Sequence, residues 1–159
     1  MSQKIKEKLF TIDNLPSKYE KRVFIGGNYK NIALLREVYK FVEQNKFQPI
    51  LVADFTIPEE KENEIALFLL QSCKFAIFEM STLGSGGELM ELERTKDYKN
   101  ITLVLYQIIY ADLEPDVPRM IKSLKKIKNN LEIWAYPNLD ELKNTISKWL
   151  EKDGSASNF

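Results

Sequence analysis

Apolar residues are distributed along this chain in two patterns that follow one another. Short runs that are apolar at almost every position are separated by longer stretches in which apolar residues recur at helical spacing. The short runs predict buried strands at residues 22–27, 47–53, 74–78, 101–106 and 131–136. The longer stretches predict helices at residues 31–43, 58–70, 86–97, 117–128 and 139–150. Five strands therefore alternate with five helices along the chain.

The strict alternation predicts an α/β fold. The strands lack a clear two-residue period, which is expected of a parallel sheet whose two faces are both buried. We therefore expect a three-layer doubly wound fold around a five-stranded parallel sheet. The 159 residues fit a single domain, expected at 1–152, with an N-terminal extension at 1–19 and a disordered polar tail at 153–159.

Composition narrows the choice of partners. The chain has 23 basic and 23 acidic residues, so its total charge predicts no attraction to nucleic acid or to a membrane surface. A small molecule is the more natural partner. Cys73 is the single cysteine and cannot form an internal disulfide, and no secretory signal or apolar run of membrane-spanning length is present. We therefore expect a cytoplasmic protein.

The chain contains no histidine, which removes several kinds of active site. A Ser-His-Asp triad, a Cys-His pair and a histidine-ligated metal site are excluded, so acid–base chemistry would fall on carboxylates, tyrosine or lysine, and no metal is expected. The glycines after the first strand do not form the G-x-G-x-x-G dinucleotide fingerprint, and no G-x-x-x-x-G-K-[ST] phosphate loop is present. No cofactor is expected.

A glycine-rich segment follows the third predicted strand. Gly84, Gly86 and Gly87 allow the backbone to approach a ligand closely, and Glu88 stands at the start of the next predicted helix. This order places the Glu88 carboxylate next to any ligand that the segment binds. The same residues also fit a plain helix start, in which Ser85 caps the helix and Glu88 completes a capping box. The segment by itself is consistent with both interpretations.

Ligands of a doubly wound sheet bind at the carboxyl ends of the strands, so the loops after the first three strands should meet at one crevice. The candidate ligand-binding residues in these loops are Gly26, Gly27, Asn28, Tyr29, Asp54, Glu79, Ser81, Gly84, Ser85, Gly86 and Gly87. Some of them have a plain structural alternative. Gly26 and Gly27 can serve a tight turn, Tyr29 can pack on the sheet edge, and Asp54 can be a loop residue or a cap.

Three short motifs at these positions resemble the nucleoside 2-deoxyribosyltransferase family. They are Gly-Gly-Asn-Tyr after the first strand, an acidic residue with Ser81 after the third, and Gly-Ser-Gly-Gly-Glu-Leu entering the next helix. The similarity spans about residues 22–106. This family is similar to the TIR domains that cleave NAD and that share its flavodoxin-like sheet. The resemblance therefore implies a flavodoxin-like fold.

The resemblance also implies an N-glycosidic bond as the target, with Glu88 as the catalytic carboxylate acting on the anomeric carbon. Such a bond breaks through an oxocarbenium-like state, which a carboxylate can stabilise or trap covalently. Glu79 would lie where relatives often keep an aspartate that orients or protonates the base, and the longer arm of glutamate departs from that pattern. Ser81 or Ser85 would contact sugar or phosphate oxygens.

Two functions follow as hypotheses. The first is an N-glycosidase or deoxyribosyltransferase-like enzyme that acts on a nucleoside, a nucleotide or an NAD-type ligand. The alternative is a nucleotide-binding sensor or TIR-like signalling domain that performs no chemistry. Relatives commonly assemble, so the resemblance also implies a homo-oligomer. Free base released in solution distinguishes the first hypothesis from the second.

Overall fold

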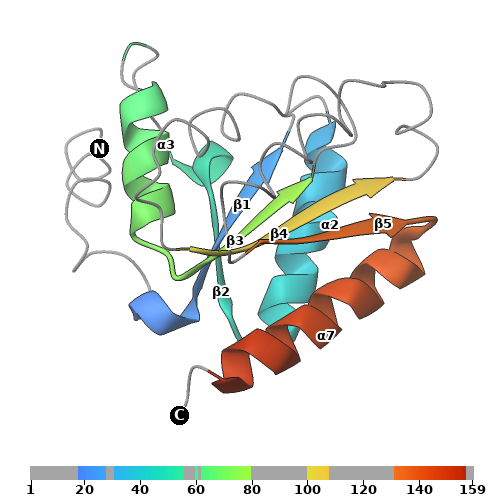
Figure 1. The fold of residues 1–159 in the computed structure, drawn as a ribbon. Coiled ribbons are helices and arrows are strands. Elements are labelled where there is room, and N and C mark those ends of the chain that lie inside the picture. Colours follow the sequence, from blue (N-terminus) through green and yellow to red (C-terminus); the bar gives the residue numbers. More distant parts are fainter. Residues whose placement is uncertain are drawn as a thin grey trace.

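The computed structural model describes residues 18–27, 31–55, 60, 62–79, 100–107 and 131–156. The strands in these residues are β1 (Arg22–Gly27), β2 (Gln48–Leu51), β3 (Phe75–Glu79), β4 (Ile101–Gln107) and β5 (Leu131–Tyr136). They form one five-stranded parallel sheet in the order β2-β1-β3-β4-β5 (Figure 1). This is the strand order of flavodoxin-like proteins, so the predicted α/β fold with a doubly wound parallel sheet is confirmed.

The strand boundaries lie close to the predicted ones. β1 and β5 have the predicted bounds, and β4 continues to Gln107. β3 is displaced by one residue from the prediction, so Glu79 is its last residue rather than the first residue after it. β2 is shorter than predicted, because Val52–Asp54 form a 3-10 turn, η4, although Val52 is buried like a strand residue. Asp54 is therefore the last residue of this turn and does not directly follow a strand.

The described residues contain the helices α2 (Ile32–Gln44), α3 (Glu62–Gln71) and α7 (Leu139–Ala156). The predicted start of α3, at Pro58, lies outside the described residues, as do the helices predicted at 86–97 and 117–128. None of the helices in the described part of the chain is long and apolar enough to cross a membrane.

The last helix is longer than predicted. α7 passes the expected end at Leu150 and continues to Ala156, so the first residues of the predicted polar tail belong to it. A contact to the sheet lies in this extension, where the Lys152 ammonium donates a hydrogen bond of 2.6 Å to a carboxylate oxygen of Glu132 on β5. This contact joins α7 to β5, the element before it in the chain, and helical spacing in the sequence does not reveal it.

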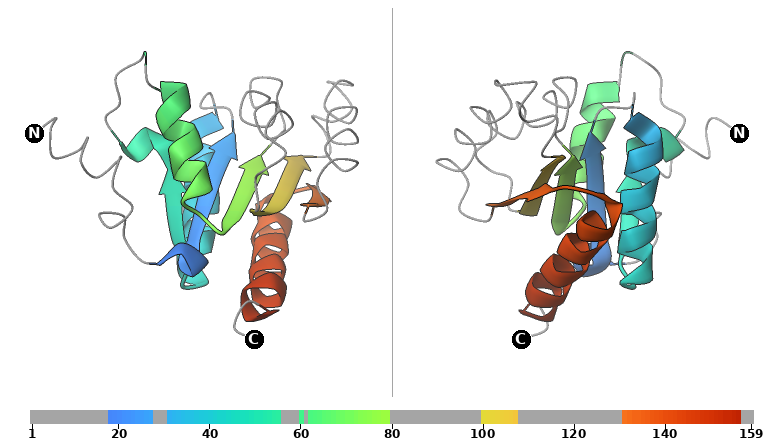
Figure 2. Two further views of the ribbon diagram at one scale, coloured as in Figure 1. Left: turned by 60° about the vertical axis from the view of Figure 1, so that its left-hand side comes forward. Right: turned by 90° about the vertical axis from the view of Figure 1, so that its right-hand side faces the viewer.

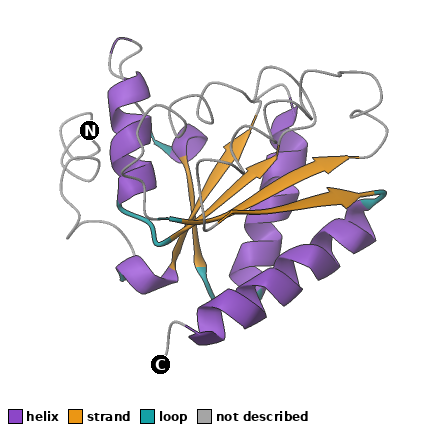
Figure 3. Cartoon of the chain, in the orientation of Figure 1, coloured by secondary structure: helices purple, strands orange, loops and turns teal. Residues whose placement is uncertain are grey.

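Helices cover both faces of the sheet (Figures 2 and 3). α3 packs on one face, whereas α2 and α7 share the other. Within β1, Val23 and Ile25 belong to the core under α2 and α7, and Phe24 belongs to the core under α3. Apolar side chains on both faces explain why the strands show no two-residue period in the sequence.

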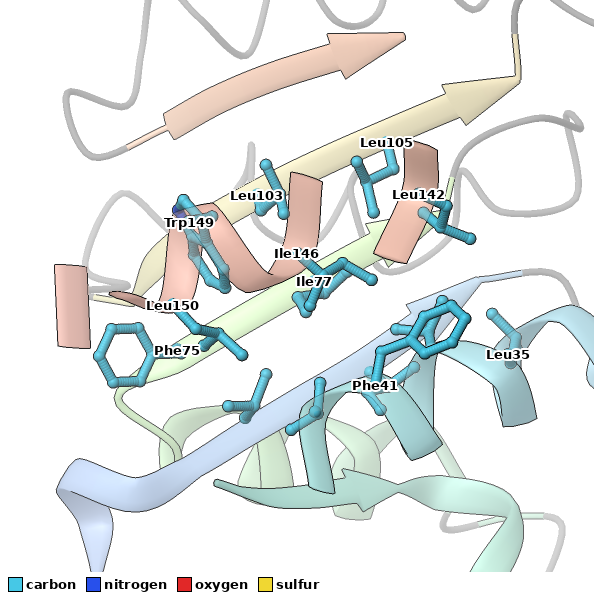
Figure 4. Close-up of a cluster of buried hydrophobic side chains, with 14 of the residues drawn as sticks. Leu35, Phe41, Phe75, Ile77, Leu103, Leu105, Leu142, Ile146, Trp149 and Leu150 are labelled. Atoms are coloured by element: carbon cyan, nitrogen blue, oxygen red, sulfur yellow. The ribbon is translucent and has the colours of Figure 1, made fainter. Parts of the chain in front are cut away.

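The core under α2 and α7 includes an aromatic contact between helix and sheet (Figure 4). The rings of Phe75, at the start of β3, and Trp149, on α7, meet edge to face with their centroids 5.7 Å apart. Aromatic pairs of this kind contribute about 0.5–1.5 kcal/mol beyond the area they bury. The contact holds the second half of α7 against the amino-terminal end of the sheet.

Two buried polar side chains form hydrogen bonds to the backbone between α3 and β3. Arg22 Nε donates a hydrogen bond of 2.6 Å to the Ser72 carbonyl. Asn100 Nδ2 donates to the carbonyls of Leu70 and Cys73 at 3.0 Å and 2.7 Å. These donors satisfy carbonyl groups that the end of a helix leaves without an intrahelical partner. Side-chain hydrogen bonds therefore hold the turn that precedes β3 in place.

Candidate functional site

The strand order reverses direction between β1 and β3, and this switch point is where a doubly wound sheet binds its ligands. The two strands are paired in parallel, and the register sets Gly27, the last residue of β1, opposite Glu79, the last residue of β3. Met80 follows Glu79 in the sequence and leads to the glycine-rich segment. The sheet therefore places the last residues of β1 and β3 side by side.

The two glycines at the end of β1 are required by close packing. A Cβ atom at Gly26 would lie 2.6 Å from the Phe78 ring, and one at Gly27 would lie 2.7 Å from a Leu35 methyl and 3.1 Å from the Glu79 carbonyl oxygen. No glycine in the described residues has a positive φ, so a left-handed turn is not the reason for them. The missing side chain at Gly27 leaves room for Glu79 beside it.

Glu79 is a buried carboxyl group at the carboxyl edge of the sheet, with 2 % of its surface exposed. The Tyr136 hydroxyl donates a hydrogen bond of 2.6 Å to Glu79 Oε2. Tyr136, the last residue of β5, is itself 1 % exposed. A buried carboxyl group needs such a partner, because an unpaired one loses its hydration without compensation. The bond ties the ends of β3 and β5 together across β4.

Sequence reasoning missed Tyr136 as part of this site. The only local signal is a tyrosine at the end of a buried strand, since a buried tyrosine hydroxyl needs a hydrogen-bond partner. Its partner Glu79 is 57 residues away in the sequence. The pairing therefore becomes visible only when the strand order is known.

Asp54 lies on the other flank of β1, after β2, and is partly exposed. It forms an ion pair with Arg36 on α2, and the side chains of Arg36 and Asp54 are 41 % and 33 % exposed. The Arg36 guanidinium also lies over the Tyr39 ring, 5.4 Å from its centroid. Burial raises the pKa of Tyr39, and the nearby Asp54 carboxylate raises it further. Asp54 is thus an anchored carboxylate at the rim of the sheet.

The described residues include Gly26, Gly27, Asp54 and Glu79 among the candidates, and all four lie at the carboxyl ends of β1, β2 and β3. Gly27 and Glu79 are direct neighbours. The remaining candidates stay predictions, because they lie outside the described residues: Asn28, Tyr29, Ser81, Gly84, Ser85, Gly86, Gly87 and Glu88. Over the described ranges, no group of three or more acidic or cysteine side chains is arranged to hold a metal ion.

Similarity to known proteins is found in structure and not in sequence. No protein-family model matches the chain, and no curated protein is significantly similar to it in sequence. Among solved structures, the fold is similar to that of the CMP N-glycosidase BcmB of Clostridium botulinum, with a TM-score of 0.61 and 16 % sequence identity. The match covers 82 % of this chain and 100 % of that one. At this identity the similarity establishes a shared fold.

Proposed function

We propose that this protein is a nucleotide N-glycosidase that hydrolyses the bond between the base and the sugar of a nucleoside 5′-monophosphate, with CMP as the first candidate substrate. One observation carries the proposal: the β1–β3 switch point ends on the buried, hydrogen-bonded Glu79, from which the chain passes into the glycine-rich segment that contains Glu88. Two further points support it. The motifs resemble nucleoside 2-deoxyribosyltransferases, and the fold is similar over the full length of a CMP N-glycosidase.

In the proposed reaction the bond between C1′ and the base nitrogen breaks. The base leaves with the bonding electrons and takes up a proton, and water supplies the hydroxyl group that C1′ receives. The carboxylate of Glu88 stabilises the positive charge that develops at C1′, or forms a transient ester with it that water then opens. With CMP the products are cytosine and ribose 5-phosphate.

For Glu79 we propose a positioning role. Its carboxyl group is buried and bonded to Tyr136, and its backbone is paired in the sheet, so it is a rigid point from which the glycine-rich segment starts. Residues that hold reacting groups in place contribute to catalysis because a small misplacement lowers the rate strongly. Gly27, directly beside Glu79, keeps this point free of a competing side chain.

The test is to incubate the purified protein with nucleoside 5′-monophosphates, the matching nucleosides and deoxynucleosides, and NAD, and to follow free base by chromatography. We expect base release from a nucleoside 5′-monophosphate. In Glu88→Gln we expect the rate to fall by about a hundredfold or more, because the amide cannot stabilise the developing charge. A second free base added to the reaction distinguishes hydrolysis from transfer, since a transferase would produce the new nucleotide.

Glu91→Gln is the matched control, because it removes the same charge from the same predicted helix at a position without a proposed role. We expect it to release base at the parental rate. Base release by Glu88→Gln at the parental rate would overturn the assignment of Glu88. Ligand binding without any base release across the panel would favour a nucleotide sensor instead.

A further inference from the structure

Asp54 ends the turn η4 that follows β2, and β2 lies beside β1 on the side away from β3 (Figure 1). The pairing of β1 with β2 ends where Leu51 lies opposite Ile25. Beyond this pair β1 continues to Gly27, whereas β2 is followed by the turn. Asp54 therefore flanks the end of β1 from the side opposite to β3.

The Asp54 carboxylate is held in place from α2. Arg36 Nη2 donates a hydrogen bond to Asp54 Oδ1, and the Arg36 guanidinium lies over the Tyr39 ring, 5.4 Å from its centroid. The residue before Arg36 is Leu35, and one of its methyl groups lies 2.7 Å from the place of a Cβ atom at Gly27. The ion pair is therefore anchored next to the end of β1, so its side chains lose little freedom when a ligand binds.

One oxygen of this carboxylate is available to a ligand. The Asp54 side chain is 33 % exposed. In the part of the chain that the structure describes, Oδ1 accepts the bond from Arg36 and Oδ2 accepts none. An ionised carboxylate is only an acceptor, so Oδ2 can bind a hydroxyl or an amino group but not a carbonyl or phosphate oxygen. The ligand group at this position must therefore be a hydrogen-bond donor.

The charge of the ion pair narrows the choice of donor. Arg36 offsets the negative charge of Asp54, so the pair repels the phosphate of a nucleotide less than a lone carboxylate would. The same offset weakens the attraction for a cationic donor such as an ammonium group. The donor that fits is neutral, which leaves a sugar hydroxyl or the amino group of a base.

The place of Asp54 in the sheet favours the sugar hydroxyl. In doubly wound proteins that bind dinucleotides, an acidic residue about 20 residues after the first glycine-rich turn accepts a hydrogen bond from the ribose 2′-hydroxyl. Asp54 has the corresponding place, because it follows the strand next to β1, although the glycine pattern at Gly26 and Gly27 differs. A ribose that reaches over the end of β1 would present its hydroxyls to this carboxylate.

Given the proposed nucleotide N-glycosidase function, on which this inference rests, we propose that Asp54 Oδ2 accepts a hydrogen bond from the 2′-hydroxyl of the substrate's ribose. This bond makes the site selective for ribonucleotides over 2′-deoxyribonucleotides, and Arg36 is a positioning residue that holds the carboxylate. A 2′-deoxyribonucleotide lacks one hydrogen bond to a charged group, which corresponds to about a tenfold to hundredfold loss of affinity.

The test titrates full-length Glu88→Gln protein with CMP and with dCMP by isothermal calorimetry, because this variant should bind a nucleotide without consuming it. The readout is the ratio of the two dissociation constants. Both ligands carry the same charge, so the ratio cancels any change in electrostatic attraction that a further variant causes. We expect CMP to bind about tenfold or more tightly than dCMP. UMP, which lacks the amino group of cytosine, is titrated as well.

Three variants in the same background locate the selectivity. Asp54→Ala removes the acceptor, so the ratio should fall to within about twofold of unity. Arg36→Gln keeps the carboxylate and removes its anchor, so we expect a ratio between those of the other two proteins. Glu37→Ala is the matched control, because it removes an acidic group from the partly exposed ion pair with Lys40 on the same helix. It should keep the original ratio.

Equal binding of CMP and dCMP would overturn the inference, and so would a preference for CMP over dCMP that Asp54→Ala retains. Loss of a preference for CMP over UMP in Asp54→Ala, with the CMP-to-dCMP ratio unchanged, would show that the carboxylate binds the base instead. Base release by the parent together with any of these results leaves the proposed glycosidase intact. An Asp54-dependent preference for CMP without base release by the parent would support this inference and contradict the glycosidase. Absence of nucleotide binding would overturn both.

Discussion

The hydroxyl of Tyr136 and the carboxyl group of Glu79 are joined by a hydrogen bond of 2.6 Å at the carboxyl edge of the sheet. Both residues are almost completely buried, and they end strands that are separated by β4. Glu79 also lies beside Gly27. The hydrogen bond, the close contact with Gly27 and the strand pairing together hold Glu79 in place next to the proposed site. Variants of these residues are needed to distinguish a contribution to stability from a contribution to function.

Tyr136→Phe should destabilise the protein, because it removes a hydrogen-bond donor from a buried carboxyl group and keeps the aromatic ring. The expected loss in the free energy of unfolding is about 1–3 kcal/mol, the cost of removing the partner of a buried polar group. Urea denaturation measures it. Tyr19→Phe is the control, because Tyr19 is 40 % exposed, and it should stay within about 0.5 kcal/mol of the parent. Equal stability of the two variants would show that the bond to Glu79 contributes nothing.

Gly27→Ala should also destabilise the protein, because its new methyl group would meet both a Leu35 methyl and the backbone of Glu79. Overpacking of this kind costs about 1–3 kcal/mol. Leu35→Val shortens the side chain that is met first, so the double variant should lose less than the sum of the two single variants. Strict additivity in urea denaturation would mean that the two positions do not clash.

The alternation of apolar runs and amphipathic stretches was sufficient to predict five buried strands and their parallel sheet. The bounds of β1 and β5 were predicted correctly, because in both the apolar run and the strand end at the same residue. The predicted end of β2 is wrong because Val52 is apolar and buried without being a strand residue. A run of apolar residues indicates burial, and a residue such as Val52 can be buried in a 3-10 turn as well as in a strand.

The positions of some candidate site residues could be predicted, and their roles stay predictions. The glycines and Glu79 lie at strand ends, which mark the ligand edge of a parallel sheet. The Tyr136 bond and the Arg36–Asp54 ion pair were not found, because each joins residues that only the folded chain brings together. The longer α7 was missed for the same reason, since Lys152 contacts Glu132 of β5 across the fold.

Stability should fall as the pH rises above about 9, through the thiol of Cys73. Burial raises its pKa to about 12, whereas an unfolded cysteine has a pKa of about 8.5. Between these values the folded state keeps a proton that the unfolded state has lost, so the free energy of unfolding should decrease by up to about 1.4 kcal/mol per pH unit. Urea denaturation between pH 8 and pH 10, at about half-unit steps, measures this slope.

Cys73→Ala is the control for this pH dependence, because it removes the titrating group and leaves the other alkaline groups in place. Its slope above about pH 9 should be shallower than that of the parent. The same burial predicts that a thiol reagent modifies Cys73 slowly in the folded protein and quickly in urea. Fast modification under native conditions would contradict the buried position of the thiol.

Asp54→Asn should have little effect on stability and a measurable effect on substrate binding. The ion pair that it removes is partly exposed, and such pairs contribute about 0.2–1 kcal/mol, less at high salt. The fold should therefore persist, in contrast to variants of the buried Glu79. Since Asp54 lies at the ligand edge, we expect the KM for a nucleoside 5′-monophosphate to rise severalfold with kcat almost unchanged. Arg36→Gln, which breaks the same ion pair from the other side, is the matched control for stability. If both variants leave KM at the parental value, Asp54 is a structural partner of Arg36 and contributes nothing to the ligand site.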